Sequence, residues 1–302
     1  MFQIVGAMST HDHVPVRRAP LQWAAAYTLL SPALIAMGLL LTAPLALLVL
    51  YSFWSQTDLG LDKHFTFLQY AGVLSRASYR ALFARSIAIS AAVTLVTVVL
   101  AYPMAYFVAF RVEKTKFFWL VLLTIPFWTS YLLRVFAWKI ILGYNGVINS
   151  GLISLGLIRE PLAFLLYNPS AVVITLAHAW AAFAILPIYV SLEKIDRELL
   201  EAAADLGDGP IRRFFRVTLP LSVPGVIGAA VLIFVPTTGD YVTPTLVGGA
   251  DGVMIANVIE VQFDKIGDWP LGAALSIATM AIVALLTVAA IRIARASTAR
   301  VT

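Results

Sequence analysis

The chain has 302 residues, of which 61% are hydrophobic and 12% are charged, and its formal net charge at pH 7 is +5. A water-soluble domain of this composition would expose much of its apolar surface to water, so that class is excluded. Since the chain has no cysteine, disulfides, iron–sulfur clusters and thiolate zinc sites are excluded as well.

Apolar segments long enough to cross a bilayer recur along the chain, and they indicate an integral membrane protein. A spanning helix needs roughly 20 apolar residues, and no run of alternating polarity competes, so the predicted fold is all-α. The first segment is too long for a signal peptide and lacks a clear cleavage site, so we expect it to remain as an anchor. Six segments qualify, at about residues 23–51, 86–110, 117–142, 169–192, 219–239 and 271–291.

Lysine and arginine gather on one side of these six spans. With the N-terminus in the cytoplasm, the inner segments hold about twice as many of them as the outer loops, which predicts that both termini are cytoplasmic. Topology therefore explains the positive charge, and we expect no nucleic-acid partner. The predicted organisation is a cytoplasmic tail (1–22), a transmembrane anchor (23–51), an extracytoplasmic loop (52–85), a five-helix core (86–291) and a cytoplasmic tail (292–302).

A charged segment, residues 193–220, lies between two apolar runs on the predicted cytoplasmic side. Asp196 can cap a first short helix, Gly207 supplies its C-terminal break, and Pro210 suits the first turn of a second helix. Glu-Ala-Ala alone would fit an ordinary solvated helix, but a longer pattern is present. Its members are Glu201, Ala202, Ala203, Gly207, Phe214, Leu219 and Pro220.

This pattern resembles the EAA loop of binding-protein-dependent ABC transporter permeases. In that family the loop is cytoplasmic and carries the coupling helix, which docks in a groove of the ATP-hydrolysing subunit. The resemblance implies the six-helix fold of a type I ABC importer permease, with these seven residues coupling the chain to its ATPase.

Further stretches are similar to the spermidine/putrescine permease subfamily, namely residues 126–138, 145–149, 192–196, 239–244 and 268–272. This similarity implies a polyamine importer of the cytoplasmic (inner) membrane that works by alternating access. It also implies three kinds of partner: a dimer of ATP-binding subunits, a second permease subunit that is usually a different chain, and an extracytoplasmic solute-binding protein. Relatives in the subfamily also serve other small solutes.

A polyamine carries several ammonium groups on methylene stems, so its path needs carboxylates or carbonyl oxygens together with aromatic faces. Asp240 is the strongest acidic candidate, because it is predicted near the outer end of the fifth span beside helix breakers, and Tyr241 follows it. Asp240 would fit a helix cap nearly as well, and the aromatic candidates fit a core or an interfacial belt better than a cation route. Those candidates, all in the third span, are Trp128, Tyr131 and Trp138.

Three basic side chains lie within the predicted spans: Arg134, Lys139 and His178. An unpaired Arg134 would repel a cationic substrate, so pairing with an acid such as Asp240 or Glu160 is expected. His178, in the middle of the fourth span, fits a hydrogen-bonded packing residue better than a proton relay.

Catalytic motifs are absent from the sequence. It contains no Gly-x-x-x-x-Gly-Lys-Ser/Thr phosphate loop, no His-Glu-x-x-His motif and no Gly-x-Ser-x-Gly elbow, so we expect no enzyme activity and no metal site. No cofactor is expected on this chain, and ATP and Mg²⁺ would bind the partner subunit. Two alternatives stay open: the same machinery importing another solute, such as iron or an organophosphonate, and a channel or anchor that works without an ATPase. Acidic residues in the later outer loops argue mildly against an anionic cargo.

Overall fold

The computed structural model describes residues 20–57, 60–165 and 167–298. The expected N-terminal tail up to residue 19 and the last four residues of the C-terminal tail lie outside this range. Contacts divide the chain into two units, Met1–Leu48 and Val49–Thr302, and each is described by itself. Within the described range, six helical segments are long and apolar enough to cross a membrane, which confirms the predicted all-α membrane fold.

The first unit consists of most of helix α1 (Pro20–Ser52). Its apolar part, Thr28–Ser52, is long enough to cross the hydrocarbon layer. Hydroxyl groups in such a helix must find partners within it, because lipid offers none. Ser31 Oγ donates to the Thr28 carbonyl at 2.8 Å and Thr42 Oγ1 donates to the Gly38 carbonyl at 2.7 Å. These bonds make the polar residues of α1 compatible with a bilayer.

The second unit begins with a short hairpin and a short helix. Strands β1 (Ser55–Thr57) and β2 (Gly60–Asp62) are antiparallel, and α2 (Leu68–Ser75) follows. Both β1 and α2 pack against the start of α12 (Trp269–Thr298). A small apolar cluster that includes Val73 and Leu275 holds this end of the unit together.

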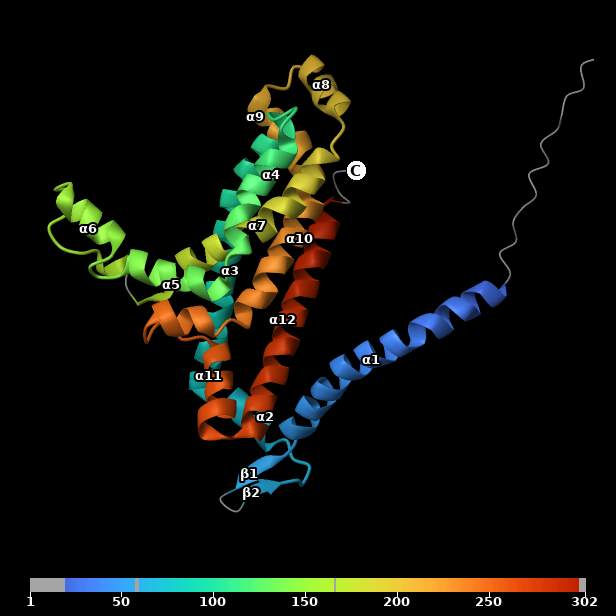
Figure 1. The fold of residues 1–302 in the computed structure, drawn as a ribbon, viewed down its shortest axis with the longest axis vertical. Coiled ribbons are helices and arrows are strands. Elements are labelled where there is room, and N and C mark those ends of the chain that lie inside the picture. Colours follow the sequence, from blue (N-terminus) through green and yellow to red (C-terminus); the bar gives the residue numbers. More distant parts are fainter. Residues whose placement is uncertain (1–19, 58–59, 166, 299–302) are drawn as a thin grey trace, which may run out of the picture. The chain divides into compact units, whose positions relative to one another are not determined.

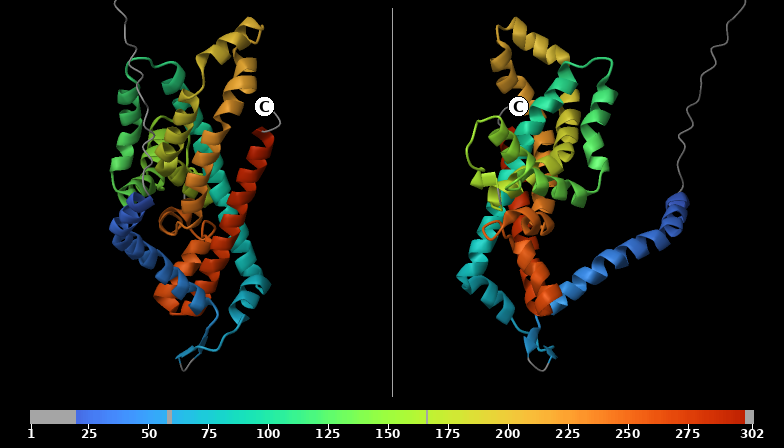
Figure 2. Two further views of the ribbon diagram at one scale, coloured as in Figure 1. Left: turned by 90° about the vertical axis from the view of Figure 1, so that its right-hand side faces the viewer. Right: turned by 60° about the vertical axis from the view of Figure 1, so that its left-hand side comes forward.

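Three long helices form the core of the second unit: α3 (Ala77–Phe110), α7 (Pro169–Glu193) and α10 (Leu219–Thr238). They lie side by side in every view (Figures 1 and 2), and α12 packs on α10. Small residues allow membrane helices to approach closely. A Cβ on Gly225 of α10 would clash with the Ser191 side chain and the Pro187 carbonyl of α7. Close packing of α7 and α10 therefore requires glycine at this position.

The predicted third span, one continuous helix over residues 117–142, is wrong. The chain forms α4 (Lys116–Thr124), a 3₁₀ turn η1 (Ile125–Trp128), α5 (Tyr131–Leu142) and α6 (Val147–Ser154). Pro126 has no N–H to continue the α-helical hydrogen bonding, and Thr129 is extended, with φ −79° and ψ 154°. Figure 1 shows α5 leaving the direction of α4. The long apolar segment in this region is instead Tyr131–Ser154.

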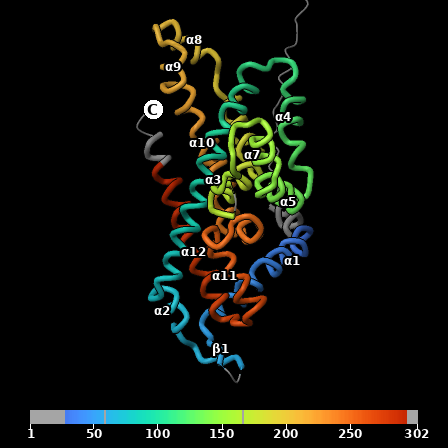
Figure 3. Tube along the Cα trace, turned by 90° about the vertical axis from the view of Figure 1, so that its left-hand side faces the viewer, coloured from blue at the N-terminus to red at the C-terminus, as the bar shows by residue number. Residues whose placement is uncertain are grey.

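Shorter helices cap the two ends of the core. After α7, the chain forms α8 (Arg197–Asp205), α9 (Pro210–Arg213) and a π-helical turn η3 (Phe214–Thr218) that leads into α10. After α10 come the π-turn η4 (Pro244–Gly248), α11 (Ile255–Val261) and the π-turn η5 (Gln262–Ile266), and η2 (Ala163–Leu165) precedes α7. Figure 3 shows α8 and α9 at one end of this unit, with α2 and α11 toward the other.

Candidate functional site

The segment 193–220, here called the coupling loop, folds into the two short helices that the sequence predicts. Asp196 caps α8, because its Oδ1 accepts the Glu198 N–H at 3.0 Å. Gly207 ends α8 with a left-handed φ of +88°, which a residue with a Cβ rarely adopts. The N–H groups of Gly207 and Asp208 then bond the carbonyls of Ala204 and Ala203, at 2.9 and 3.0 Å.

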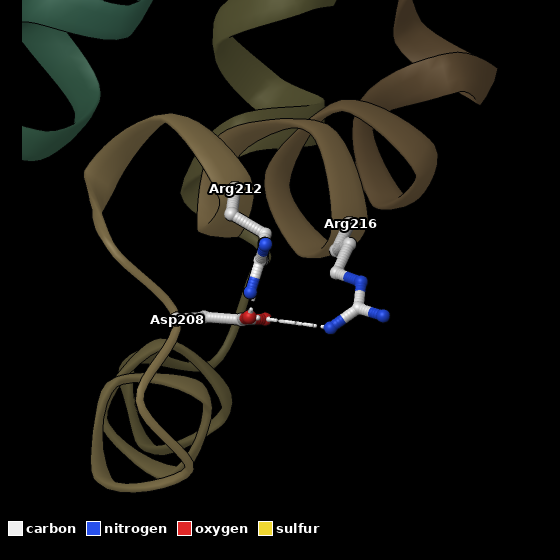
Figure 4. Close-up of polar contacts among 3 residues, drawn as sticks. All are labelled: Asp208, Arg212 and Arg216. Atoms are coloured by element: carbon white, nitrogen blue, oxygen red, sulfur yellow. Dashed lines mark hydrogen bonds and ion pairs between the residues drawn. The ribbon is translucent and has the colours of Figure 1, made fainter.

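The second half of the coupling loop is braced against the first. Pro210 occupies the first turn of α9, as predicted. The Asp208 carboxylate accepts a hydrogen bond from Arg216 Nη1 at 3.2 Å, and Arg212 Nε lies 3.8 Å from it (Figure 4). Arg213 Nη1 reaches back to the Leu200 carbonyl of α8 at 3.4 Å.

Some residues of the EAA pattern are exposed to solvent, and others are buried or half-buried. Glu201, Ala202 and Gly207 are exposed, whereas Ala203 is buried. Phe214 turns toward the core, where its ring meets Tyr102 and Tyr106 of α3 edge-on at centroid distances of 5.7 and 6.1 Å. Phe214 therefore holds the loop on the core helix α3, whereas α8, which carries Ala203, packs on α9 and η3. Leu219 and Pro220, both half-buried, begin α10.

The coupling loop exposes large apolar side chains that the sequence reasoning missed. Leu206 is 89% exposed and Ile211 is 77% exposed, one on each side of Gly207, and Phe215 is 61% exposed. We call these three residues the docking patch. Large apolar side chains that a polar loop exposes to solvent are candidates for an interaction surface. Their signal in the sequence was the presence of large apolar residues inside a charged segment.

An ion pair fixes the point from which the coupling loop leaves the core. Lys116 Nζ, at the start of α4, lies 2.6 Å from Glu193 Oε1 at the end of α7. This pair ties the α4 helix to the first residue of the loop. A displacement of the loop can therefore reach α4 as well as α7 and α10.

A second candidate site lies where α10 ends. Asp240 Oδ1 accepts the N–H groups of Val242 and Thr243, at 2.9 and 3.4 Å. Its Oδ2 accepts the Tyr131 hydroxyl at 2.6 Å, and that hydroxyl also lies 2.6 Å from Thr243 Oγ1. Asp240 thus caps a helical turn, as one reading of the sequence expected, and it also meets one of the aromatic candidates of the third span.

Tyr131 belongs to a continuous group of rings, which we call the aromatic cluster. Its members are Phe127, Tyr131, Trp138, His178, Trp180 and Phe183, with successive ring centroids 5.4 to 6.5 Å apart. Trp180 was missed by the sequence reasoning, because it lies on α7, far along the chain from Tyr131. Its Nε1 is buried and has no hydrogen-bond partner among the described residues.

The expected ion pair of Arg134 is not present, because the ion pairs among the described residues include neither Arg134 with Asp240 nor Arg134 with Glu160. Arg134 Nη1 instead donates to the Ala179 carbonyl at 3.3 Å. Its guanidinium carbon lies 4.9 Å from the centroid of Phe127 and 6.0 Å from that of Tyr131. A carbonyl and two ring faces thus take the place of the acid.

The remaining pathway candidates are placed differently. Trp128 ends η1 with 80% of its surface exposed, and Tyr241 is 46% exposed. Trp138 packs against the core, with its ring 5.4 Å from that of His178. The structure therefore brings Tyr131 and Asp240 into contact and places Trp138 in the same aromatic cluster as Tyr131.

Comparison with known proteins shows that the chain is similar to membrane permease proteins. The spermidine/putrescine transport system permease protein PotB of Escherichia coli K12 is 40% identical over 227 residues, which is 75% of this chain and 82% of that protein. The inner membrane ABC transporter permease protein YdcU of the same organism is 32% identical over 276 residues, covering 83% and 87% of the two chains.

A solved structure has the same fold. A chain of a bacterial alginate ABC transporter, in complex with an alginate pentasaccharide-bound periplasmic protein, superposes with a TM-score of 0.69 at 16% identity. The superposition covers 92% of this chain and 96% of that one. The family model described as binding-protein-dependent transport system inner membrane component matches residues 70–302. The chain therefore belongs to this family of membrane permease components.

Proposed function

We propose that this chain is a permease subunit of an ATP-driven ABC importer that carries polyamines across the inner membrane. The observation that carries the proposal is the 40% identity, over 227 residues, to a permease of a spermidine/putrescine transport system. The chain is a transport subunit and not an enzyme, because its family consists of permease components, and ATP hydrolysis belongs to a separate subunit. ATP and Mg²⁺ would bind that subunit.

The proposed assembly contains two ATP-binding subunits, a second permease that is a different chain, and an extracytoplasmic solute-binding protein. The coupling loop supports the first of these partners, since it presents the exposed docking patch on two short helices that hydrogen bonds join. In this arrangement both termini and the coupling loop lie in the cytoplasm. Closure of the ATP-bound subunits would move the loop, and the loop would move α7 and α10 to open the cavity outward.

Asp240 and the aromatic cluster form the proposed polyamine path. Asp240 Oδ2 accepts its hydrogen bond from the Tyr131 hydroxyl, a partner that another donor can replace. A substrate ammonium group could take the place of this hydroxyl while Oδ1 stays on the backbone amides of Val242 and Thr243. The rings of Tyr131 and Trp180 would then receive the methylene stem and a second ammonium group.

The test is uptake of radiolabelled putrescine and spermidine by the complete complex in proteoliposomes. Asp240→Asn should lower uptake by at least about tenfold, since a neutral amide cannot balance an ammonium charge. Asp251→Asn is the matched control, since it removes the same charge from an exposed loop position outside the aromatic cluster. Wild-type uptake by Asp240→Asn would remove Asp240 from the path. Absence of polyamine uptake by the wild-type complex, with uptake of ferric iron or an organophosphonate instead, would overturn the polyamine assignment.

A further inference from the structure

One carboxylate on the coupling loop has an environment unlike that of its neighbours. The side chain of Asp208 is only 12% exposed, although it lies at the turn between two surface helices. The side chains of Arg212 and Arg216, which approach it, are 69% and 68% exposed. Figure 4 shows both arginines converging on Asp208 from successive turns of the chain. The carboxylate is therefore enclosed at the turn while its partners reach in from solvent.

Asp208 is attached to both halves of the loop. Its N–H bonds the Ala203 carbonyl of α8 at 3.0 Å, which fixes its backbone to the end of the first helix. Its two carboxylate oxygens lie 3.2 and 3.4 Å from Arg216 Nη1, on the π-turn η3. Asp208 therefore connects α8 with α9 and η3. Among the described residues, the other side-chain hydrogen bond between α8 and the α9–η3 segment runs from Arg213 to the Leu200 carbonyl.

The charges around Asp208 explain why its carboxylate stabilises this connection. Arg212, Arg213 and Arg216 place three positive charges within five residues, and these charges repel one another. Asp208 lies between two of them and offsets that repulsion. Without its charge, the contact between Asp208 and Arg216 would weaken, and the arginines would lose the carboxylate that offsets their repulsion.

We propose that Asp208 is a positioning residue that sets the angle between α8 and α9, and so presents the docking patch to the ATP-binding subunit. This inference rests on the proposed function of the coupling loop. A loop that transmits a stroke must keep its internal angle under load, because any bending within it absorbs movement intended for α7 and α10. Loss of the Asp208 contact should therefore separate ATP hydrolysis from transport while leaving the permease folded.

The experiment measures substrate transported per ATP hydrolysed by the complete complex in proteoliposomes. Asp208→Asn keeps the shape of the side chain and removes its charge, and the ratio should fall about threefold to tenfold. Asp205→Asn is the matched control, since it removes the same charge from an exposed position three residues earlier. The exchange of charges in Asp208→Arg with Arg216→Asp should restore much of the ratio, which a purely structural role of Asp208 would not predict.

A distance measurement reports the angle directly. Because the chain has no native cysteine, cysteines at Glu198 on α8 and Pro210 on α9 give a unique pair for spin labels outside the docking patch. The distance distribution between them should broaden in Asp208→Asn and narrow again in the charge exchange. An unchanged distribution and an unchanged transport ratio in Asp208→Asn would overturn the inference.

The proposed role of Asp208 and the proposed coupling function of the loop can be tested separately. If Leu206→Asp and Gly207→Pro uncouple the complex but Asp208→Asn does not, the loop docks as proposed and Asp208 does not position it. If Leu206→Asp and Gly207→Pro also leave transport and ATPase assembly normal, the coupling function itself is wrong. If Asp208→Asn fails to accumulate in the membrane, the charge exchange decides: failure to restore the transport ratio overturns the inference.

Discussion

Replacing Leu206 with alanine should weaken binding of the ATP-binding subunit without destabilising the permease. Leu206 is 89% exposed at the tip of the coupling loop, so the folded chain gains little from its side chain. In the proposed complex the same side chain would be removed from water by the ATPase. The substitution therefore separates the free energy of binding from the free energy of unfolding.

The expected magnitude follows from the exposed surface of the side chain. Leucine carries three more carbons than alanine, and each buried methylene contributes about 0.8 kcal/mol. Nearly full burial of Leu206 thus predicts a loss of about 2 kcal/mol, or roughly a 30-fold increase in Kd for the ATP-binding subunit. A surface substitution of this kind should change the free energy of unfolding by no more than about 0.5 kcal/mol.

The assay is a titration of purified ATP-binding subunit against the permease pair in nanodiscs, with thermal unfolding measured on the same samples. Leu285→Ala is the matched control, because it removes the same atoms from a 71% exposed position on the membrane-spanning helix α12. Ile211→Ala should resemble Leu206→Ala, since Ile211 lies on the other side of the same turn. Affinities within about threefold of wild type for both loop variants would refute the docking patch.

Three further substitutions test the packing and the local geometry. Gly225→Ala should destabilise the chain by about 1–3 kcal/mol, because the new Cβ clashes with α7. Gly228→Ala is the control, since a Cβ there meets nothing closer than 4.0 Å. Equal melting temperatures for the two alanine variants would contradict the packing argument. Lys116→Ala should cost less than about 1 kcal/mol, since the pair with Glu193 is partly exposed, and exchanging the two charges should recover the loss in a thermal melt. Gly207→Ala should cost about 1 kcal/mol from its left-handed φ alone, since open space surrounds that position; an unchanged unfolding temperature would show that the turn is not held there.

The features that the sequence determined are those that depend on neighbouring residues. Length and composition are enough to define a membrane-spanning segment, because the bilayer requires about 20 apolar residues whatever surrounds them. The caps at Asp196 and Gly207 were predicted correctly for a similar reason: a cap bonds N–H groups or carbonyls only a few residues away. The EAA pattern likewise lies within one segment, so its residues were recognisable without a tertiary structure.

One local feature was nevertheless misjudged. The apolar run over residues 117–142 looks like a single span, yet the helix ends at Trp128 and restarts at Tyr131. Proline inside a membrane helix is often tolerated, because neighbouring helices satisfy the freed backbone groups. Pro32 and Pro44 lie inside α1 and Pro103 lies inside α3 without ending either helix. The proline pattern alone thus cannot distinguish a continuous helix from a broken one.

The pairing of distant residues was decided by the tertiary structure. Tyr131 and Asp240 are 109 residues apart, and Trp180 reaches the aromatic cluster from a third segment. A membrane helix is apolar toward lipid and apolar toward its neighbours, so its sequence does not indicate which face packs inward. For the same reason, the sequence did not predict that the Phe214 side chain turns toward α3. Local chemistry therefore determined the EAA motif and every span except the third, whereas helix packing decided which side chains meet.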